Sequence, residues 1–161
     1  MNHALEIITI LGPIVIKSDG YAITSLNFGQ IRSKTPQKTL PVLNEASKQL
    51  YSYFKNISFK FTVPINPSGT DFQLNVWNYL SNIPYGETKT YGAIANILNT
   101  SPRAIGAACS RNPILIVIPC HRVLGSNGNL GGFSGGSGIN TKICLLKHEN
   151  ANQNLYLKQK S

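Results

Sequence analysis

Acidic side chains are scarce in this sequence. Its 161 residues include 6 Asp and Glu against 15 Lys and Arg, which gives a formal net charge of +9. Charged residues make up only 13% of the chain, compared with roughly 25% in a typical soluble domain. The basic balance therefore comes from a shortage of acids, and an anionic partner is the first expectation.

The sequence also lacks long apolar runs and a cysteine framework. No apolar stretch approaches the ~20 residues of a transmembrane helix. The opening residues, MNHALE, do not have the basic start of a signal peptide. The cysteines at positions 109, 120 and 144 follow no disulfide spacing. These absences exclude a membrane channel and a secreted mini-protein, and they predict a soluble cytoplasmic protein with reduced thiols.

The acids are missing above all from the second half of the chain. Between Glu87 and Glu149 there is no Asp or Glu, whereas Lys and Arg occur at positions 89, 103, 111, 122, 142 and 147. A surface built from this stretch has no counter-charge of its own, and phosphate backbones are common partners of such surfaces. Charge alone leaves two interpretations open: nucleic-acid binding, or a basic surface that only keeps the protein soluble.

Residues 1–68 predict a small N-terminal α/β domain. Alternating apolar residues favour three strands, over residues 5–10, 13–17 and 21–28. Asp19-Gly20 supplies a hairpin turn between the last two. Apolar residues then recur at helical spacing over residues 41–55. A further strand is expected over residues 57–63, and a proline-containing linker follows it.

Residues 69–161 predict a mostly helical domain with a short tail. The sequence TDFQ at 70–73 has the pattern of a capping box at a helix start. Second and third helices are expected over residues 90–98 and 101–111, joined by a tight turn, which is typical of a helix-turn-helix. A last helix is expected over residues 140–149.

The third of these helices presents a face of small side chains. Ile105, Ala108 and Cys109 fall on the inward side of a helical projection. The opposite side carries Arg103, Ala104, Ala107 and Ser110. A helix with so little bulk can approach a nucleic-acid groove closely. An ordinary surface helix has the same pattern, so the local sequence leaves both open.

The segment Pro119-Cys120-His121-Arg122-Val123 is the candidate chemical centre. Residues 114–118 before it predict a buried strand or extended segment. The thiolate is the reactive form of cysteine, and a neighbouring imidazole or cation favours it. Neighbours in sequence need not point the same way, so a catalytic and a structural Cys120 both stay open here. Cys109 and Cys144 fit the pattern of inert, buried cysteines.

From Gly69 to Glu149 the sequence resembles the methylated-DNA–protein-cysteine methyltransferases, also called O6-alkylguanine-DNA alkyltransferases. The similarity rests on motifs in the same order: GTDFQ (69–73), IPYG (83–86), TY (90–91), RAIG (103–106), NP (112–113), PCHRV (119–123), GGFSGG (131–136) and LLKHE (145–149). The first half resembles the family only in its strand-rich layout. The resemblance implies an RNase H-like N-terminal domain and a winged-helix-like catalytic domain.

The same resemblance implies four catalytic residues. Cys120 takes the alkyl group, and His121 acts through a water as general base. Glu149 orients His121, and Asn112 holds the active-site turn. The thioether product resists hydrolysis, so the protein works once and stops. The displacement needs no cofactor.

Substrate and DNA contacts are implied as well. Tyr91 donates to the base ring, the carbonyls of Cys120 and Val123 accept from the guanine amine, and the Ser134 amide faces the substrate oxygen. Arg103 replaces the flipped nucleotide in the duplex, from a helix that lies in the minor groove. Further candidate DNA contacts are Thr100, Ser101, Ala104, Ala107 and Ser110.

Three departures from the family pattern stand out. Phe133 occupies a position where many members have Tyr, so stacking on the base is kept while a hydroxyl is lost. The loop over residues 137–141 is slightly longer than in many members, which makes Lys142 a candidate only for the family's pocket lysine. No cysteine precedes Cys109, so the zinc site of some members is not expected.

We therefore predict a monomeric, single-turnover DNA-repair protein. Its substrate would be O6-alkylguanine in duplex DNA, with O4-alkylthymine as a second candidate lesion. No metal and no membrane are expected to take part. Three alternatives remain: a lesion-binding relative that does not react, a helix-turn-helix transcription factor with a structural Cys120, and a thiol hydrolase that uses Cys120 and His121.

Overall fold

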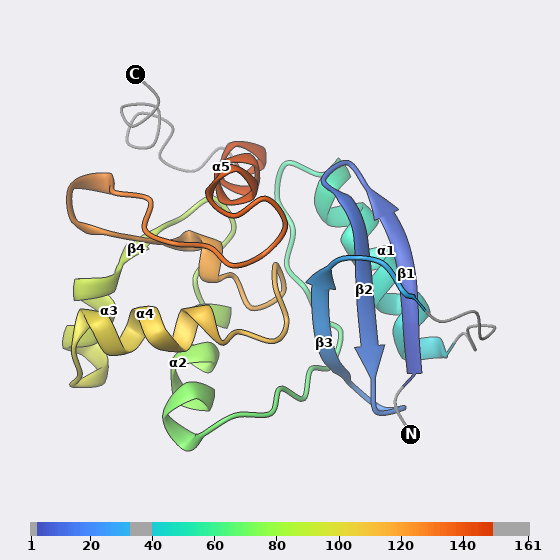
Figure 1. Ribbon diagram of the computed structural model, residues 1–161, viewed down its shortest axis with the longest axis horizontal. Coiled ribbons are helices and arrows are strands. Elements are labelled where there is room, and N and C mark those ends of the chain that lie inside the picture. Colours follow the sequence, from blue (N-terminus) through green and yellow to red (C-terminus); the bar gives the residue numbers. More distant parts are fainter. Residues whose placement is uncertain (1–2, 33–39, 150–161) are drawn as a thin grey trace. The chain divides into compact units, whose positions relative to one another are not determined.

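The computed structural model describes residues 3–32 and 40–149, shown in Figure 1. The chain separates into two compact units. Unit 1 comprises the chain up to Ser68 together with Pro113–Leu115, and unit 2 comprises Gly69–Asn112 and the chain from Ile116 onward. Strands dominate unit 1 and helices dominate unit 2, so the protein has mixed α/β content with its larger sheet at the N-terminal end.

Unit 1 is a three-stranded antiparallel sheet with one helix packed against it (Figure 1). Its elements are β1 (His3–Thr9), β2 (Gly12–Ser18), β3 (Ile23–Phe28) and α1 (Pro41–Lys55). The three predicted strands, the turn at Asp19-Gly20 and the helix are all confirmed. Alternate strand residues and one helix stripe form the core, as the periodicity requires. The fully buried side chains include Ile14, Ile16, Leu26, Leu43 and Leu50.

The prediction of a strand over residues 57–63 was wrong. The amides of Thr62 and Val63 donate to Oε1 of the buried Gln49, at 2.9 and 3.1 Å, instead of to a neighbouring strand. The two phenylalanine rings of this segment pack together, with the Phe59 and Phe61 centroids 5.0 Å apart, whereas Ile57 is exposed. An alternation of apolar and polar residues can thus occur in a segment whose rings pack together outside any sheet.

A short excursion of the chain into unit 1 comes just before the candidate site. The Leu26 amide of β3 donates to the Pro113 carbonyl at 2.9 Å, and the Leu115 amide donates to the Leu26 carbonyl at 3.0 Å. Only Ile114 makes a sheet bridge, so the run 114–118 is mainly buried but is not a continuous strand. Ile116 adopts a φ of 71°, which β-branched residues rarely do.

Unit 2 contains four α-helices and a small parallel sheet among its described residues. The helices are α2 (Asp71–Ser81), α3 (Tyr91–Leu98), α4 (Pro102–Ser110) and α5 (Ile139–His148). The sheet pairs β4 (Lys89–Thr90) with β5 (Val123–Leu124). The predicted capping box at Thr70 is present in both of its hydrogen bonds. Thr90 caps α3 and Ser101 caps α4 by accepting from backbone amides, so all four helices begin close to where the sequence predicts.

Burial on the helices follows the predicted faces on α4 but not on α5. Ile105, Ala108 and Cys109 are buried as expected. The indole Nε1 of Trp77 donates to the Ala108 carbonyl at 2.9 Å, which ties α2 to α4. Cys144, in contrast, is exposed, so its prediction as a buried cysteine was wrong. The inward positions of α5 belong to Thr141, Lys142, Ile143, Leu145 and Leu146.

Within the described ranges, none of the helices has both the length and the apolar character that a membrane span needs.

Candidate active site

Cys120 begins a short 3-10 helix, η1 (Cys120–Arg122), and is 5% exposed. The turn before it is held by Asn112, whose Nδ2 donates to the Ile118 carbonyl at 2.7 Å. The Cys120 amide donates to the same carbonyl at 2.8 Å. The Asn112 side chain also hydrogen-bonds to the Cys120 thiol. Asn112 therefore fixes both the approach of the chain and the sulfur.

A buried network of three side chains includes the two residues that directly follow Cys120, His121 and Arg122, together with Glu149. His121 Nε2 lies 2.6 Å from Glu149 Oε2. Arg122 donates from Nε to Glu149 Oε1 at 2.8 Å and from Nη2 to Oε2 at 3.0 Å, which is the strong two-point arrangement. Its Nη1 donates to the Ile83 carbonyl at 2.6 Å. The Gly86 amide adds a contact to Oε1 at 3.3 Å, so both carboxylate oxygens are engaged.

The protonation states of this network follow from its contacts. Burial alone would raise the pKa of Glu149, but His121 and Arg122 outweigh it and hold that pKa well below its usual 4.5. Burial lowers the pKa of His121, so its ring is neutral. Because an ionised Glu149 only accepts hydrogen bonds, Nε2 must carry the ring proton. Nδ1 is left with a lone pair, is buried, and has no hydrogen-bond partner among the described residues. This atom is available as a base.

Lys142 is a second buried cation and is fully enclosed. Its Nζ donates to the Val123 carbonyl at 2.7 Å and lies 3.4 Å from the Gly132 carbonyl. Burial lowers the pKa of Lys142 to about 8. The Nζ atom is 5.8 Å from the centre of the Tyr91 ring. Lys142 therefore holds the strand after Cys120 to the glycine-rich loop.

The charge of Lys142 also acts on the nucleophile. Burial raises the pKa of Cys120, while the Asn112 hydrogen bond and the Lys142 charge oppose that rise. Because burial is the largest of these influences, the resting thiol keeps its proton. A thiolate forms only when a base removes that proton during the reaction.

Cys120 lies at the wall of a cavity of about 610 Å³. The cavity wall also includes five other residues predicted for the site: Tyr91, Arg103, Ser110, Phe133 and Ser134. His121, Glu149 and Asn112 are not among the residues that line it. Val123 is buried, and its carbonyl already accepts from Lys142. A carbonyl has a second lone pair, so the expected guanine contact stays open.

Tyr91 and Gly131 meet at very close range in this cavity. Gly131 has a φ of 68°, and a Cβ built on it would lie 2.9 Å from the Tyr91 hydroxyl. A side chain at Gly131 would therefore collide with the ring. Burial raises the pKa of Tyr91, so its hydroxyl stays protonated and can donate a hydrogen bond.

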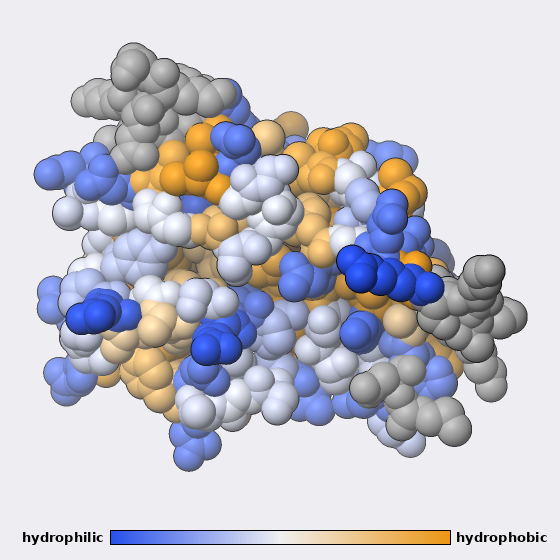
Figure 2. Space-filling model, viewed as in Figure 1, coloured by the Kyte–Doolittle hydropathy of each residue, from blue (hydrophilic) through white to orange (hydrophobic). Residues whose placement is uncertain are grey.

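The predicted DNA-contacting residues lie on or just before α4. Arg103, Ala107 and Ser110 are exposed, and Ala104 is partly exposed. The surface over α4 in Figure 2 carries pale and strongly blue atoms side by side. Ser101 has a structural use as well, because its hydroxyl accepts from the Ala104 amide at 3.1 Å. Thr100 precedes it and donates from its amide to Ala95.

The structure changes the meaning of the acid-free stretch. Two of its six cations, Arg122 and Lys142, are buried and bound inside unit 2. The exposed ones are Lys89, Arg103, Arg111 and Lys147. The stretch therefore supplies both a basic surface and the internal charges of the site.

Sequence reasoning missed three contributors to the site. Arg122 was expected to act on the thiol, but its guanidinium lies on Glu149. Cys109 was expected to be inert in the interior, but it lines the cavity beside Cys120. Gly131 gave a signal only as one glycine among many. Of these three, only Arg122 had a partner that the sequence could have indicated. Glu149 is the first acid after Glu87, so it is the next carboxylate along the chain that could pair with Arg122.

Residues 3–32 and 40–149 hold no group of three or more His, Cys, Asp and Glu side chains that could bind a metal ion.

These features define a protein that does its chemistry on one cysteine. A thiol faces an open cavity, a neutral histidine offers a free lone pair, and a glutamate–arginine pair fixes that histidine. Such a site is suited to accepting a group onto sulfur.

Comparison with known proteins identifies the family. The model of the 6-O-methylguanine DNA methyltransferase DNA-binding domain matches residues 71–151. A methylated-DNA–protein-cysteine methyltransferase of Methanosarcina acetivorans is 45% identical over 146 residues, which cover 86% of this chain and 92% of that protein. The crystal structure of Mycobacterium tuberculosis OGT in complex with DNA superposes with a TM-score of 0.80 at 40% identity, covering 92% of each chain. The chain belongs to the methylated-DNA–protein-cysteine methyltransferase family.

Proposed function

We propose that this protein repairs alkylated DNA by direct reversal, moving the alkyl group from O6-alkylguanine onto Cys120. The observation that carries the proposal is the placement of a buried thiol at a cavity wall, next to the His121–Glu149–Arg122 network. The relatives named above are methyltransferases that act on methylated DNA through a protein cysteine. The transfer is irreversible, so each molecule acts once.

The transfer is a displacement at carbon. The Cys120 sulfur attacks the alkyl carbon, a carbon–sulfur bond forms, and the bond from that carbon to O6 breaks. The electron pair stays on the guanine, which becomes a good leaving group when its ring accepts a proton or hydrogen bond. Tyr91, which lines the cavity and keeps its hydroxyl proton, is the donor in this proposal. The thioether carries no charge that would assist its own reversal.

The proton of Cys120 leaves through His121. Nδ1 is the free atom of that ring, and a water between it and the sulfur would complete the path. Glu149 stabilises the imidazolium that forms, and Arg122 keeps Glu149 ionised and in place. Lys142 adds positive charge near the developing thiolate.

The remaining cavity residues position the base. Phe133 offers a ring for stacking, and the Ser134 amide faces the position of the substrate oxygen. The carbonyls of Cys120 and Val123 accept from the guanine amine. The lesion must leave the base stack to reach the thiol, because that atom is inaccessible within the duplex.

Helix α4 is the proposed DNA-reading element. Its small residues Ala104 and Ala107 allow close approach to the minor groove, and Thr100, Ser101 and Ser110 contact the backbone. Arg103 lies at the first turn of α4 and also lines the cavity. Its side chain can therefore fill the space that the flipped nucleotide vacates in the duplex, at the edge of the cavity that receives the base.

The finer description of the fold is also part of this proposal. We assign residues 1–68 to an RNase H-like domain and residues 69–161 to a winged-helix-like catalytic domain. The antiparallel sheet with α1 supports the first assignment, and the helices with the β4–β5 pair support the second. All site residues come from one chain, so we propose that the protein acts as a monomer. The free thiols support a cytoplasmic setting.

The test is the mass of the protein after incubation with a duplex that carries O6-methylguanine. We expect one methyl group on the tryptic peptide of residues 112–122, located on Cys120. Cys120→Ala should gain no methyl group and still bind the duplex. Cys144→Ser, which changes an exposed thiol on α5, should behave as the unaltered protein does. Binding without any mass gain would instead support the lesion-binding alternative, and a methyl group on another residue would refute the assignment of Cys120.

A further inference from the structure

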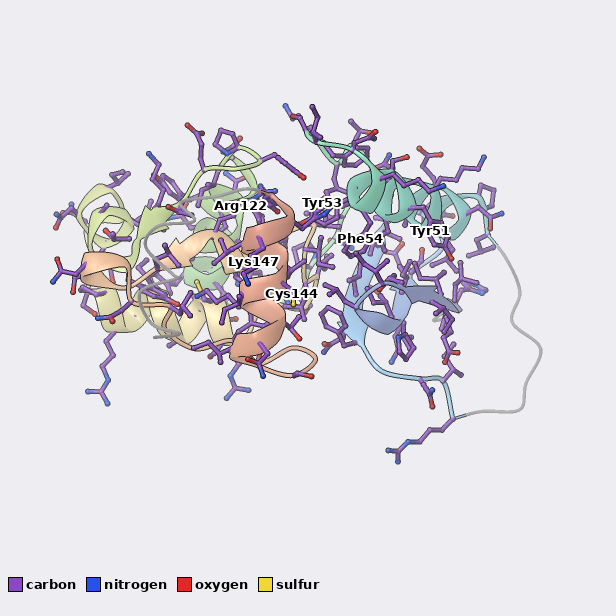
Figure 3. The ribbon with its side chains drawn as sticks, turned by 90° about the horizontal axis from the view of Figure 1, so that it is seen from above. Tyr51, Tyr53, Phe54, Arg122, Cys144 and Lys147 are labelled. Atoms are coloured by element: carbon purple, nitrogen blue, oxygen red, sulfur yellow. The ribbon has the colours of Figure 1, made fainter. Side chains whose placement is uncertain are left out.

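Cys109 is a buried nucleophile that the transfer reaction does not use. It is 8% exposed, lies in the last turn of α4, and lines the same cavity as Cys120. The third thiol, Cys144, is exposed on α5 and is absent from that wall (Figure 3). Two of the three thiols, Cys109 and Cys120, therefore line the same cavity.

Hydrogen bonds through Asn112 connect the backbone at Cys109 with the backbone at Cys120. The Asn112 amide donates to the Cys109 carbonyl at 3.2 Å. Its side chain donates to the Ile118 carbonyl at 2.7 Å, and the Cys120 amide donates to that same carbonyl at 2.8 Å. The end of α4 and the start of η1 are thus held by one residue, and the thiols of Cys109 and Cys120 are near enough to interact electrostatically.

Both thiols also share their charged neighbour. Lys142 interacts electrostatically with Cys109 and with Cys120. Burial raises the pKa of Cys109 to about 12, and the charge of Lys142 works against that rise. The charge of Lys142 therefore favours the thiolate form of both cysteines.

We propose that Cys109 and Cys120 form a disulfide when the protein meets a peroxide, and that this disulfide is a reversible, protected form of the reactive cysteine. A single reactive cysteine oxidises stepwise to sulfinic and sulfonic acids, which reducing thiols do not restore. A second thiol in the same cavity diverts the first oxidation product into a bond that a dithiol can break.

The steps balance without further reactants. Hydrogen peroxide oxidises the Cys120 sulfur to a sulfenic acid and leaves as water. The Cys109 sulfur attacks the Cys120 sulfur, so the S–S bond forms and the S–O bond breaks. The departing hydroxide takes the Cys109 proton and becomes a second water. The protein has lost two hydrogen atoms in total.

The sequence allows the product to be read directly. Arg111 lies between the two cysteines, so trypsin places Cys109 on the peptide 104–111 and Cys120 on the peptide 112–122. The experiment uses the full chain with Cys144→Ser, which removes the exposed thiol and its intermolecular disulfides. The protein is treated with hydrogen peroxide, quenched with catalase, blocked with N-ethylmaleimide and digested.

We expect the two peptides to appear joined, with a mass two hydrogens below their sum. Methyl-transfer activity should fall as the amount of joined peptides rises, and dithiothreitol should restore it. Protein that has first been methylated by O6-methylguanine duplex should give no joined pair, because its Cys120 sulfur is occupied.

A matched variant, Cys109→Ser in the same background, tests the protection. Its methyl-transfer activity after peroxide treatment is compared with the activity of the same variant before treatment. We expect dithiothreitol to restore none of the lost activity, and we expect sulfinic acid to accumulate on Cys120. If the variant does not fold, the joined peptides of the Cys109-containing protein decide alone.

The proposal is overturned if no joined pair forms, or if Cys120 reaches sulfinic acid equally with and without Cys109. Failure of the proposed function is a separate outcome, because a reduced protein that transfers no methyl group would still form the joined peptides.

Discussion

Glu149 is the residue on which the internal charges of the site converge. It is 3% exposed, yet it stays ionised because Arg122 contacts both of its oxygens and His121 donates to one of them. A buried carboxylate without such partners would be neutral. The pair thereby fixes the tautomer of His121 and leaves Nδ1 with a free lone pair.

The first prediction concerns Glu149 and pH. Since its pKa in the folded protein lies below the usual 4.5, the unfolded chain binds this proton first as the pH falls. The free energy of unfolding should therefore decrease on acidification below that value. Glu149→Gln should show a shallower decrease there, and at neutral pH it should be about 3–5 kcal/mol less stable because Arg122 loses its buried partner.

Urea unfolding across this pH range measures both effects. Burial also lowers the pKa of His121 from 6.5, so His121 likewise reduces the free energy of unfolding as the pH falls. For this reason the pH slope of the unaltered protein is compared with that of Glu149→Gln. Equal slopes for the two proteins would mean that folding does not lower the pKa of Glu149.

The second prediction concerns the glycine beside Tyr91. Gly131→Ala places a Cβ 2.9 Å from the Tyr91 hydroxyl at a positive φ. The displaced ring should slow methyl transfer by at least about tenfold, equivalent to ~1.4 kcal/mol. Gly132→Ala is the matched control, because nothing lies within 4 Å of its added Cβ. Single-turnover rates on the same duplex compare the two variants, and equal rates would remove Tyr91 from the mechanism.

At the scale of elements, local signals predicted the helices well. Thr70, Thr90 and Ser101 cap α2, α3 and α4 because each side-chain oxygen accepts from an amide of the first turn. Those signals are local and can be read in sequence. The segment 57–63 was mispredicted because its amides pair with Gln49, more than a dozen residues earlier. Such distant pairing leaves no trace in the local alternation.

The third prediction belongs to α4. Arg103→Ala should slow repair of duplex DNA by about 10- to 100-fold, because the cost of flipping a nucleotide is a few kcal/mol and the inserted side chain offsets part of it. Transfer from the free modified base, which needs no flipping, should change much less.

Arg111→Ala is the control for this helix. It removes one exposed positive charge just after α4 without touching the first turn. It should weaken DNA binding at low salt and leave the difference between duplex and free base unchanged. If Arg103→Ala lost equally on both substrates, its role in flipping would be wrong.

At the scale of the molecule, the candidate site draws on positions far apart in the chain. Tyr91 belongs to α3, Cys120 to η1, and both Lys142 and Glu149 to α5 and its C-cap. A fourth segment contributes the Ile83 carbonyl, which accepts from Arg122. Periodicity and capping cannot bring such residues together, since they describe one element at a time. The motif around Cys120 and its family resemblance predicted the members of the site, but the burial of Arg122 and Lys142 emerged only in three dimensions.

The whole-molecule charge also takes on a more definite meaning. The net charge of +9 includes two buried cations, Arg122 and Lys142. The exposed remainder on unit 2 is modest, which suits weak, sequence-independent contact with phosphates. A protein that must search undamaged DNA for a rare lesion is served by such weak binding.

The central claim is that each molecule accepts one alkyl group on Cys120 and then stops. The most direct measurement follows the methyl groups transferred per protein molecule in the presence of excess O6-methylguanine duplex. The account predicts a single burst that ends at one methyl group per molecule, with no slow phase after it. Continued transfer beyond one equivalent, or a burst that persists in Cys120→Ala, would contradict it.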